Sequence, residues 1–140
     1  MNRGFHTAFA YLATLGCVAV MVQAITAGQL VDGGSTAMHG IGAGAVHLVQ
    51  LGQLVAAVLL WRPGRGPAWP AVVSLVILLA GFAQSATGGS GAVAVHVPLG
   101  VTVFGLSVWA TVWAWSRRAV PGQMVGEPDR LGQPVAGSGA

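Results

Sequence analysis

The sequence predicts an all-α fold, a bundle of four transmembrane helices that run alternately up and down. Hydrophobic residues make up 54% of the 140 residues and charged residues only 6%, whereas a soluble domain carries roughly 25% charged residues. The apolar residues also form long continuous runs, not the alternating pattern of a membrane β-barrel. Because a helix satisfies its backbone hydrogen bonds within itself, it is the form that such runs adopt in lipid.

Each apolar run is long enough to cross the hydrocarbon core, which takes roughly 20 residues as a helix. The runs cover residues 7–30, 37–61, 69–87 and 92–115. Arg3 precedes the first run as in a secretory signal, but this run is too long for one and further runs follow it. The connections at 31–36, 62–67 and 88–91 are short and rich in turn-forming residues. Connections this short force consecutive helices to run antiparallel.

The arginines predict how the bundle is oriented in the membrane. They lie before the first run, between the second and third, and after the fourth: Arg3, Arg62, Arg65, Arg117, Arg118 and Arg130. By the positive-inside rule, both termini and the middle connection are cytoplasmic. Tryptophans, which favour the membrane interface, gather at the same ends of the runs: Trp61, Trp69, Trp113 and Trp115. The sequence therefore predicts a multi-pass protein of the inner (plasma) membrane, surrounded by the lipid bilayer.

Residues 1–118 are predicted to form the transmembrane domain, and residues 119–140 a disordered cytoplasmic tail. The tail is rich in Gly and Pro and has no apolar period, so it buries too little to offset its chain entropy. The chain has no Lys, and its scattered arginines form no basic patch, so no nucleic-acid partner is expected. The single cysteine, Cys17, excludes an intrachain disulfide and a cysteine metal cluster.

Two histidines are the leading candidates for a functional site, because polar side chains in transmembrane helices are costly and mark functional positions by default. His39 and His96 each lie in the first turn of a run that starts on the outer side, so they come to a similar depth on parallel helices. Two imidazoles on opposite faces of a flat ring are ligands that a haem iron takes in a helical bundle. The pattern predicts one haem b between the second and fourth helices, with His39 and His96 as metal ligands. His47 is rotated by roughly 80° from the His39 face and is expected to make an interhelical hydrogen bond, with a ligand or proton-handling role as the alternative.

Small residues and two glutamines complete the candidate cofactor site. Gly42, Ala43 and Gly100, one turn below the histidines, are expected to leave room for the macrocycle. Residues 23–28 and 84–89 share Gln, Thr and a final Gly, and each segment precedes one of the two histidines. This weak repeat indicates two hairpins related by a pseudo-two-fold axis along the membrane normal. Gln23 and Gln84 then either bridge helices or contact the cofactor or a quinone.

Hydrolytic and proton-relay sites are excluded by where the acids lie. Asp32, Glu127 and Asp129 all fall outside the apolar runs. A carboxylate relay, a di-metal carboxylate site or a Ser-His-Asp site therefore cannot be built within the spans. Any redox chemistry has to come from a bound cofactor. We expect an electron-transfer or accessory protein more than an independent enzyme.

The segments 23–28, 39–42 and 96–101 resemble a group of small, uncharacterised four-span bacterial membrane proteins. Over roughly residues 5–118, the chain is also similar to one four-helix half of haem A synthase and to four-helix membrane b-type cytochromes. Each half of haem A synthase has haem-ligand histidines on its second and fourth helices near the outer surface, which carries over to His39 and His96. This chain has a single half and lacks the catalytic glutamate of that family. The resemblance therefore implies haem binding more than haem modification.

Three functions stay open at this point. The first is a cytochrome b type protein that holds one haem for electron transfer and hands electrons to a membrane-protein partner, a second copy of the chain or a quinone. The alternative is a cofactor-free accessory or assembly subunit of a larger membrane complex, in which Gly- and Ala-rich faces such as residues 40–44 pack against other helices. The third is a small transporter or quinone-binding module that uses Gln23, Gln50 and Gln84.

Overall fold

The computed structural model describes residues 2–117, and all the regular structure in this range is α-helix. The helices are α1 (Arg3–Val31), α2 (Thr36–Trp61), α3 (Trp69–Gly89) and α4 (Val93–Ser116). All four are long and apolar enough to cross a membrane. The prediction of an all-α protein with four helices long and apolar enough to span a membrane is therefore confirmed, whereas the tail predicted at 119–140 lies outside the described residues.

Polar caps set where the first two helices begin. α1 begins at Arg3, ahead of the apolar run, because Oδ1 of Asn2 accepts hydrogen bonds from the N–H groups of Gly4 and Phe5, at 2.9 and 3.3 Å. Ser35 caps α2 in the same way, with Oγ accepting from the N–H of Ala37 at 3.2 Å. Hydrophobic patterning thus marks the part of a helix that is suited to lipid, and the caps decide how far the helix extends beyond it.

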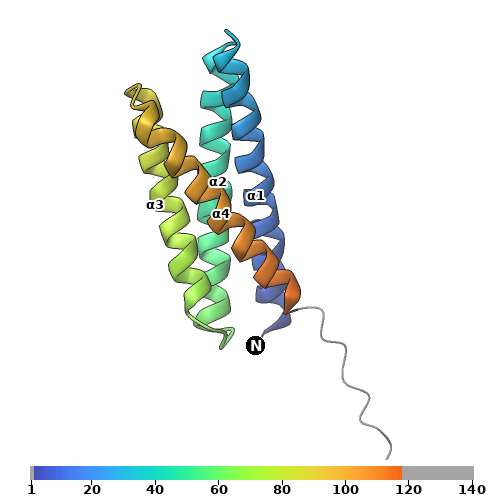
Figure 1. The fold of residues 1–140 in the computed structure, drawn as a ribbon. Helices are drawn as coiled ribbons and strands as arrows, with labels where there is room; N and C mark the ends of the chain where they lie inside the picture. The colour runs from blue at the N-terminus through green and yellow to red at the C-terminus, as the bar shows by residue number, and fades with distance from the viewer. Residues whose placement is uncertain (1, 118–140) are drawn as a thin grey trace, which may run out of the picture.

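Consecutive helices run antiparallel and form two hairpins, α1–α2 and α3–α4 (Figure 1). α1 and α3 each pack against both α2 and α4. Within the described residues, no Cα atom of α2 lies within 8 Å of a Cα atom of α4, and the same holds for α1 and α3. α2 and α4 therefore occupy one diagonal of the bundle and point in the same direction.

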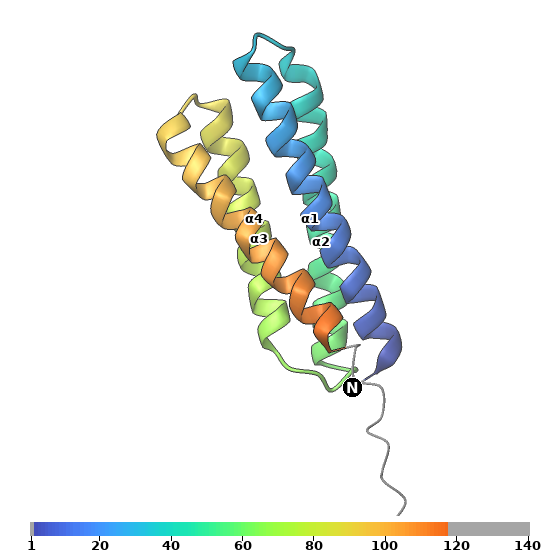
Figure 2. The ribbon, with the colours of Figure 1, turned by 45° about the vertical axis from the view of Figure 1, so that its right-hand side comes forward.

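The core fills one end and the middle of the bundle. The end that carries the N-terminus is named here the arginine end, and the end that carries His39 and His96 the histidine end. The first cluster lies at the arginine end and consists mostly of alanines, whose small side chains allow the helices to pack closely. Its members are Phe9, Ala10, Ala13, Ala56, Ala57, Leu60, Ala71, Ala110 and Ala114. The second cluster lies at mid-bundle: Val20, Val46, Ile77 and Val103. Residues 21–45 and 82–102, which form the histidine end, include no buried side chain, and the hairpins diverge there (Figure 2).

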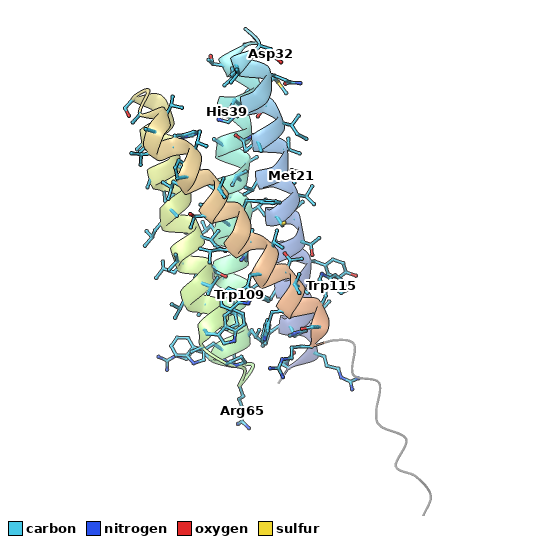
Figure 3. All side chains as sticks on the ribbon, in the orientation of Figure 1. Met21, Asp32, His39, Arg65, Trp109 and Trp115 are labelled. Atoms are coloured by element: carbon cyan, nitrogen blue, oxygen red, sulfur yellow. The ribbon has the colours of Figure 1, made fainter. Side chains whose placement is uncertain are left out.

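Aromatic side chains gather at the arginine end. Trp69 stacks on Trp109 with ring centroids 4.8 Å apart and meets Trp113 edge-on at 4.6 Å. Arg65, Trp109 and Trp115 lie at the opposite end of the bundle from Asp32 and His39 (Figure 3). The tryptophans therefore share one end with the arginines, in the arrangement that is typical of a membrane interface.

Gly64 permits the tight connection between α2 and α3. Its N–H donates to the carbonyl of Leu59 at 2.9 Å, and its own carbonyl accepts from the N–H of Asn2 at 3.0 Å. A Cβ at Gly64 would collide with the backbone carbonyl oxygens of Leu59 and Leu60, which belong to a helix end and cannot swing aside.

We expect Gly64→Ala to lower the free energy of unfolding by about 1–3 kcal/mol, measured by thermal unfolding in detergent. Gly105→Ala is the matched control, since a Cβ there meets open space, and equal stability of the two variants would contradict the prediction.

Candidate functional site

The candidate site lies at the histidine end, where His39 and His96 come together across the diagonal of the bundle. Each is the fourth residue of its helix, α2 or α4, so two parallel helices bring them to a similar height. Their ring centroids are 6.4 Å apart, and their ring planes make an angle of 62°. Both side chains are half-buried. The structure thus brings together the two histidines that the sequence singles out.

His96 is oriented by the backbone of the neighbouring helix. Its Nδ1 lies 2.9 Å from the carbonyl oxygen of Gln84 on α3. A carbonyl oxygen only accepts hydrogen bonds, so Nδ1 must carry a proton and donate it. In the neutral imidazole, the other nitrogen, Nε2, then has a free lone pair.

His39 is oriented by Thr26 on α1 in an equivalent way. Its Nδ1 lies 3.0 Å from Oγ1 of Thr26. The carbonyl oxygen of Gln23 also lies 3.0 Å from this hydroxyl and can only accept its single proton. Both hydrogen bonds form together when Nδ1 of His39 donates to the hydroxyl oxygen, and neutral His39 then also has its lone pair on Nε2. Each histidine is held by the other helix of its own hairpin.

This pattern is typical of metal-binding histidines, in which the second ring nitrogen donates a hydrogen bond and so fixes the tautomer. A metal–nitrogen bond is about 2.0–2.1 Å, so two imidazoles on opposite sides of one metal ion have ring centres about 6 Å apart. The separation of 6.4 Å between His39 and His96 fits that spacing. Within residues 2–117, no group of three or more His, Cys, Asp or Glu side chains comes together for a metal ion. The chain thus offers a metal two imidazoles here, as it would to the iron of a haem.

Two glutamines lie one turn closer to the bundle centre than the histidines. The side chain of Gln23 covers Gly42, where an added Cβ would collide with its Nε2. Gln84 covers Gly100 in the same way, with Nε2 2.7 Å from the position of an added Cβ. The room that the sequence predicts over these glycines is therefore filled by two amide groups, which form the floor of the site. Ala43, beside Gly42, is half-buried.

The two glutamine contacts give the sequence repeat a structural meaning. In each hairpin, the repeated Gln of the first helix packs on a glycine of the second helix, and the histidine lies one turn beyond that glycine. The hydrogen bonds to the histidines differ between the hairpins, because His39 bonds to the hydroxyl of Thr26 and His96 to the carbonyl of Gln84. The hairpins are therefore similar in packing without being identical in hydrogen bonding.

Gly88 lies directly beside the His96 ring. A Cβ on Gly88 would lie 2.8 Å from Cε1 and 3.0 Å from Nδ1 of His96. Any larger residue would therefore displace the imidazole or the helix that carries it. The next residue, Gly89, is different, because a Cβ there meets nothing within 4 Å.

His47 lies apart from the pair, at the boundary of α2 and α3. Its ring stacks on Phe82, with centroids 4.4 Å apart and planes 11° apart. Its Nε2 is 3.5 Å from Oγ of Ser85, a long hydrogen bond between helices. The expected interhelical hydrogen bond is therefore present.

Three supports of the histidines are missed by sequence reasoning: the hydroxyl of Thr26, the carbonyl of Gln84 and the bare backbone of Gly88. Thr26 belongs to the repeated segment, which is the signal that could have revealed it. A backbone carbonyl leaves no trace in a sequence, because every residue has one. Gly88 belongs to a glycine-rich segment, so the sequence does not distinguish it from the glycines beside it.

The fold and the site together define the class: a four-helix bundle whose helices are long and apolar enough to cross a membrane, with two neighbouring histidines at one end. Comparison of the chain with known protein families, with curated proteins and with solved structures finds no match. The resemblance to small four-span bacterial proteins, haem A synthase and membrane b-type cytochromes therefore stays a prediction.

Proposed function

We propose that this chain is a membrane haem protein of the cytochrome b type, in which His39 and His96 bind the iron of one haem b between α2 and α4. The observation that carries the proposal is the pair of neighbouring imidazoles, each with Nδ1 in a hydrogen bond, at 6.4 Å between ring centroids. Neither histidine has to give up its hydrogen bond to become a ligand. A bound haem supplies one-electron redox chemistry.

The surroundings of the histidines suit a flat, largely apolar group. Residues 21–45 and 82–102 have no buried side chain, so this end of the bundle lacks a core of its own. Gln23 and Gln84 cover the glycines one turn below the histidines and would place their amide groups next to a bound haem.

We place the arginine end in the cytoplasm, with both termini on that side and the helices crossing up, down, up and down. The support is the positive-inside rule, because the connections at 31–36 and 88–91 contain neither Arg nor Lys. The gathering of tryptophans at the arginine end agrees with this orientation. The haem site then lies in the outer half of the inner (plasma) membrane.

Electron transfer is the role that such a site supports. A haem in the outer half reaches only one side of the membrane, so electrons have to continue to a membrane-protein partner, a second copy of the chain or a quinone. The spans contain no Asp or Glu to act as acid or base. The residues of this chain therefore hold and orient the haem, and we propose an electron carrier, not an independent enzyme.

The proposal is tested by absorbance spectra of the full-length protein purified from haem-replete cells, in the oxidised and reduced states. We expect a Soret band and, after reduction, the sharp visible bands of an iron with two imidazole ligands. Extraction of the haem into alkaline pyridine then identifies it as haem b. A colourless protein that also fails to bind added hemin in detergent would rule the proposal out.

The contact between Gly88 and His96 gives a second test. Gly88→Ala places a methyl group against the imidazole, so we expect hemin to bind about 10-fold more weakly, as when a supporting partner of a metal ligand is removed. Gly89→Ala is the matched control, because its methyl group meets open space. Hemin titrations of the two variants compare them directly, and equal affinities would show that the position of the His96 ring does not matter.

A second candidate function, a cofactor-free accessory subunit, is favoured by one separate observation. Gly40 and Gly44 lie four residues apart on α2, both are exposed, and a Cβ on either meets nothing within 4 Å. Such a pair allows another transmembrane helix to approach closely. Under this alternative, the protein purifies colourless, and Gly40→Leu or Gly44→Leu releases it from a larger complex.

A further inference from the structure

A layer of buried polar side chains crosses the middle of the bundle, away from the proposed haem site. It lies between the two apolar clusters and is named here the polar layer. Its members are each 1% exposed: Gln50 and Gln53 on α2, Ser74 on α3 and Ser107 on α4. Polar groups at this depth are costly, because lipid offers them no hydrogen bonds. Their presence on three helices at one level therefore calls for partners within the protein.

Some of these groups have partners and some do not. Nε2 of Gln53 donates to Oγ of Ser74 at 3.2 Å, and the Ser107 hydroxyl donates to the carbonyl of Val103 at 2.8 Å. In contrast, Nε2 and Oε1 of Gln50 and Oε1 of Gln53 are buried without a hydrogen-bond partner. A buried amide with neither atom bonded is rare in native proteins, because its desolvation is not compensated.

Packing fixes the Gln50 amide where it is. Its Oε1 lies 2.6 Å from the position that a Cβ of Gly81 would take, so the amide rests against the backbone of α3. Gly81 is itself buried, and a residue with any side chain would fill this space. In this position the amide lies inside the bundle, so a partner for it has to lie there too.

We propose that the polar layer binds internal water at the unpaired Gln50 amide. A buried water makes about three hydrogen bonds to otherwise unsatisfied groups. The layer offers one donor group, Nε2 of Gln50, and the two unpaired Oε1 atoms as acceptors. Water both donates and accepts, so it can partner groups of either kind.

The water site is independent of the proposed haem. It lies closer to the arginine end than His47 on α2, and none of its residues contacts His39 or His96 through a hydrogen bond described above. A water bound there would hydrate the middle of the bundle, between the two apolar clusters. The experiment can therefore be done on the protein with or without haem. A negative result for the water site would not affect the proposed haem site, and the reverse is also true.

The experiment is NMR of the full-length protein in detergent, with ¹⁵N in the glutamine side-chain amides. Gln50→Met, which keeps the length of the side chain and removes the amide, identifies the Gln50 signal; sequential assignment of the unmodified protein identifies it if the variant does not fold. We expect the Gln50 amide protons to show a nuclear Overhauser effect to water with the sign of a long-lived contact. Exposed Gln29 is the control, because surface water exchanges too fast to give that sign.

Two results would overturn the proposal. The first is a Gln50 amide with no cross-peak at the water frequency, which means that the layer is dry. The second is a set of cross-peaks from Gln50 to a co-purified molecule other than water.

Discussion

His39→Ala and His96→Ala are each expected to purify with almost no haem, and this is the largest effect we predict. The two imidazoles are the only side chains that we assign to the iron, and removing a ligand costs more than removing its supporting hydrogen bond, which lowers metal affinity by about 10–100-fold. The measurement is haem bound per protein, by absorbance and by extraction. Hemin titration of each purified variant gives the loss of affinity.

His47→Ala is the matched control for this prediction. His47 is also a half-buried histidine of α2, but it stacks on Phe82 and contacts Ser85, not His96. We expect His47→Ala to keep its haem. Thermal unfolding of all three variants without haem separates a lost ligand from a lost fold. If His39→Ala and His96→Ala folded and kept full haem, the assignment of the ligands would be wrong.

Thr26→Val is expected to weaken haem binding by about 10–100-fold, the range seen when a hydrogen-bond partner of a metal-binding histidine is removed. Valine has the shape of threonine but cannot accept the proton of His39 Nδ1, which lies 3.0 Å from Oγ1 of Thr26. An imidazole without this acceptor is a weaker electron donor to ferric iron, so the midpoint potential should rise. Hemin titration and a redox titration measure the two effects.

Thr26→Ser tests whether the hydroxyl itself is responsible. Serine keeps an oxygen at the same position and is expected to restore both the affinity and the potential. A merely structural role of Thr26 would change stability but leave the potential where it was. If Thr26→Val and Thr26→Ser had the same potential as the unmodified protein, His39 would not be positioned through Thr26.

The helices of this protein could be predicted from its sequence because lipid imposes a simple requirement. A run of apolar residues about 20 long has to be a helix, since no other conformation satisfies its backbone. The helix ends could not be placed as well, because they depend on single side chains such as Asn2 and Ser35, whose hydrogen bonds lie outside the apolar pattern.

The pairing of His39 and His96 could be anticipated because both stand in the first turn of helices that start on the same side. The filling of the space over Gly42 and Gly100 could not, because it depends on how closely two helices approach and on which long side chain reaches the gap. The same limit applies to Gln50 and Gln53. Their polarity is visible in the sequence, whereas the lack of partners for their amide atoms appears only when all four helices are in place.

The uneven core has a consequence for how the protein is made. Tight contacts at the arginine end, such as the alanine cluster and the Trp69 stack, join the helices without any cofactor. We therefore expect the newly inserted chain to assemble from that end first and to remain loosely packed around His39 and His96. Loading of a prosthetic group would then be the last step of maturation, in which the incoming ring supplies the missing interior.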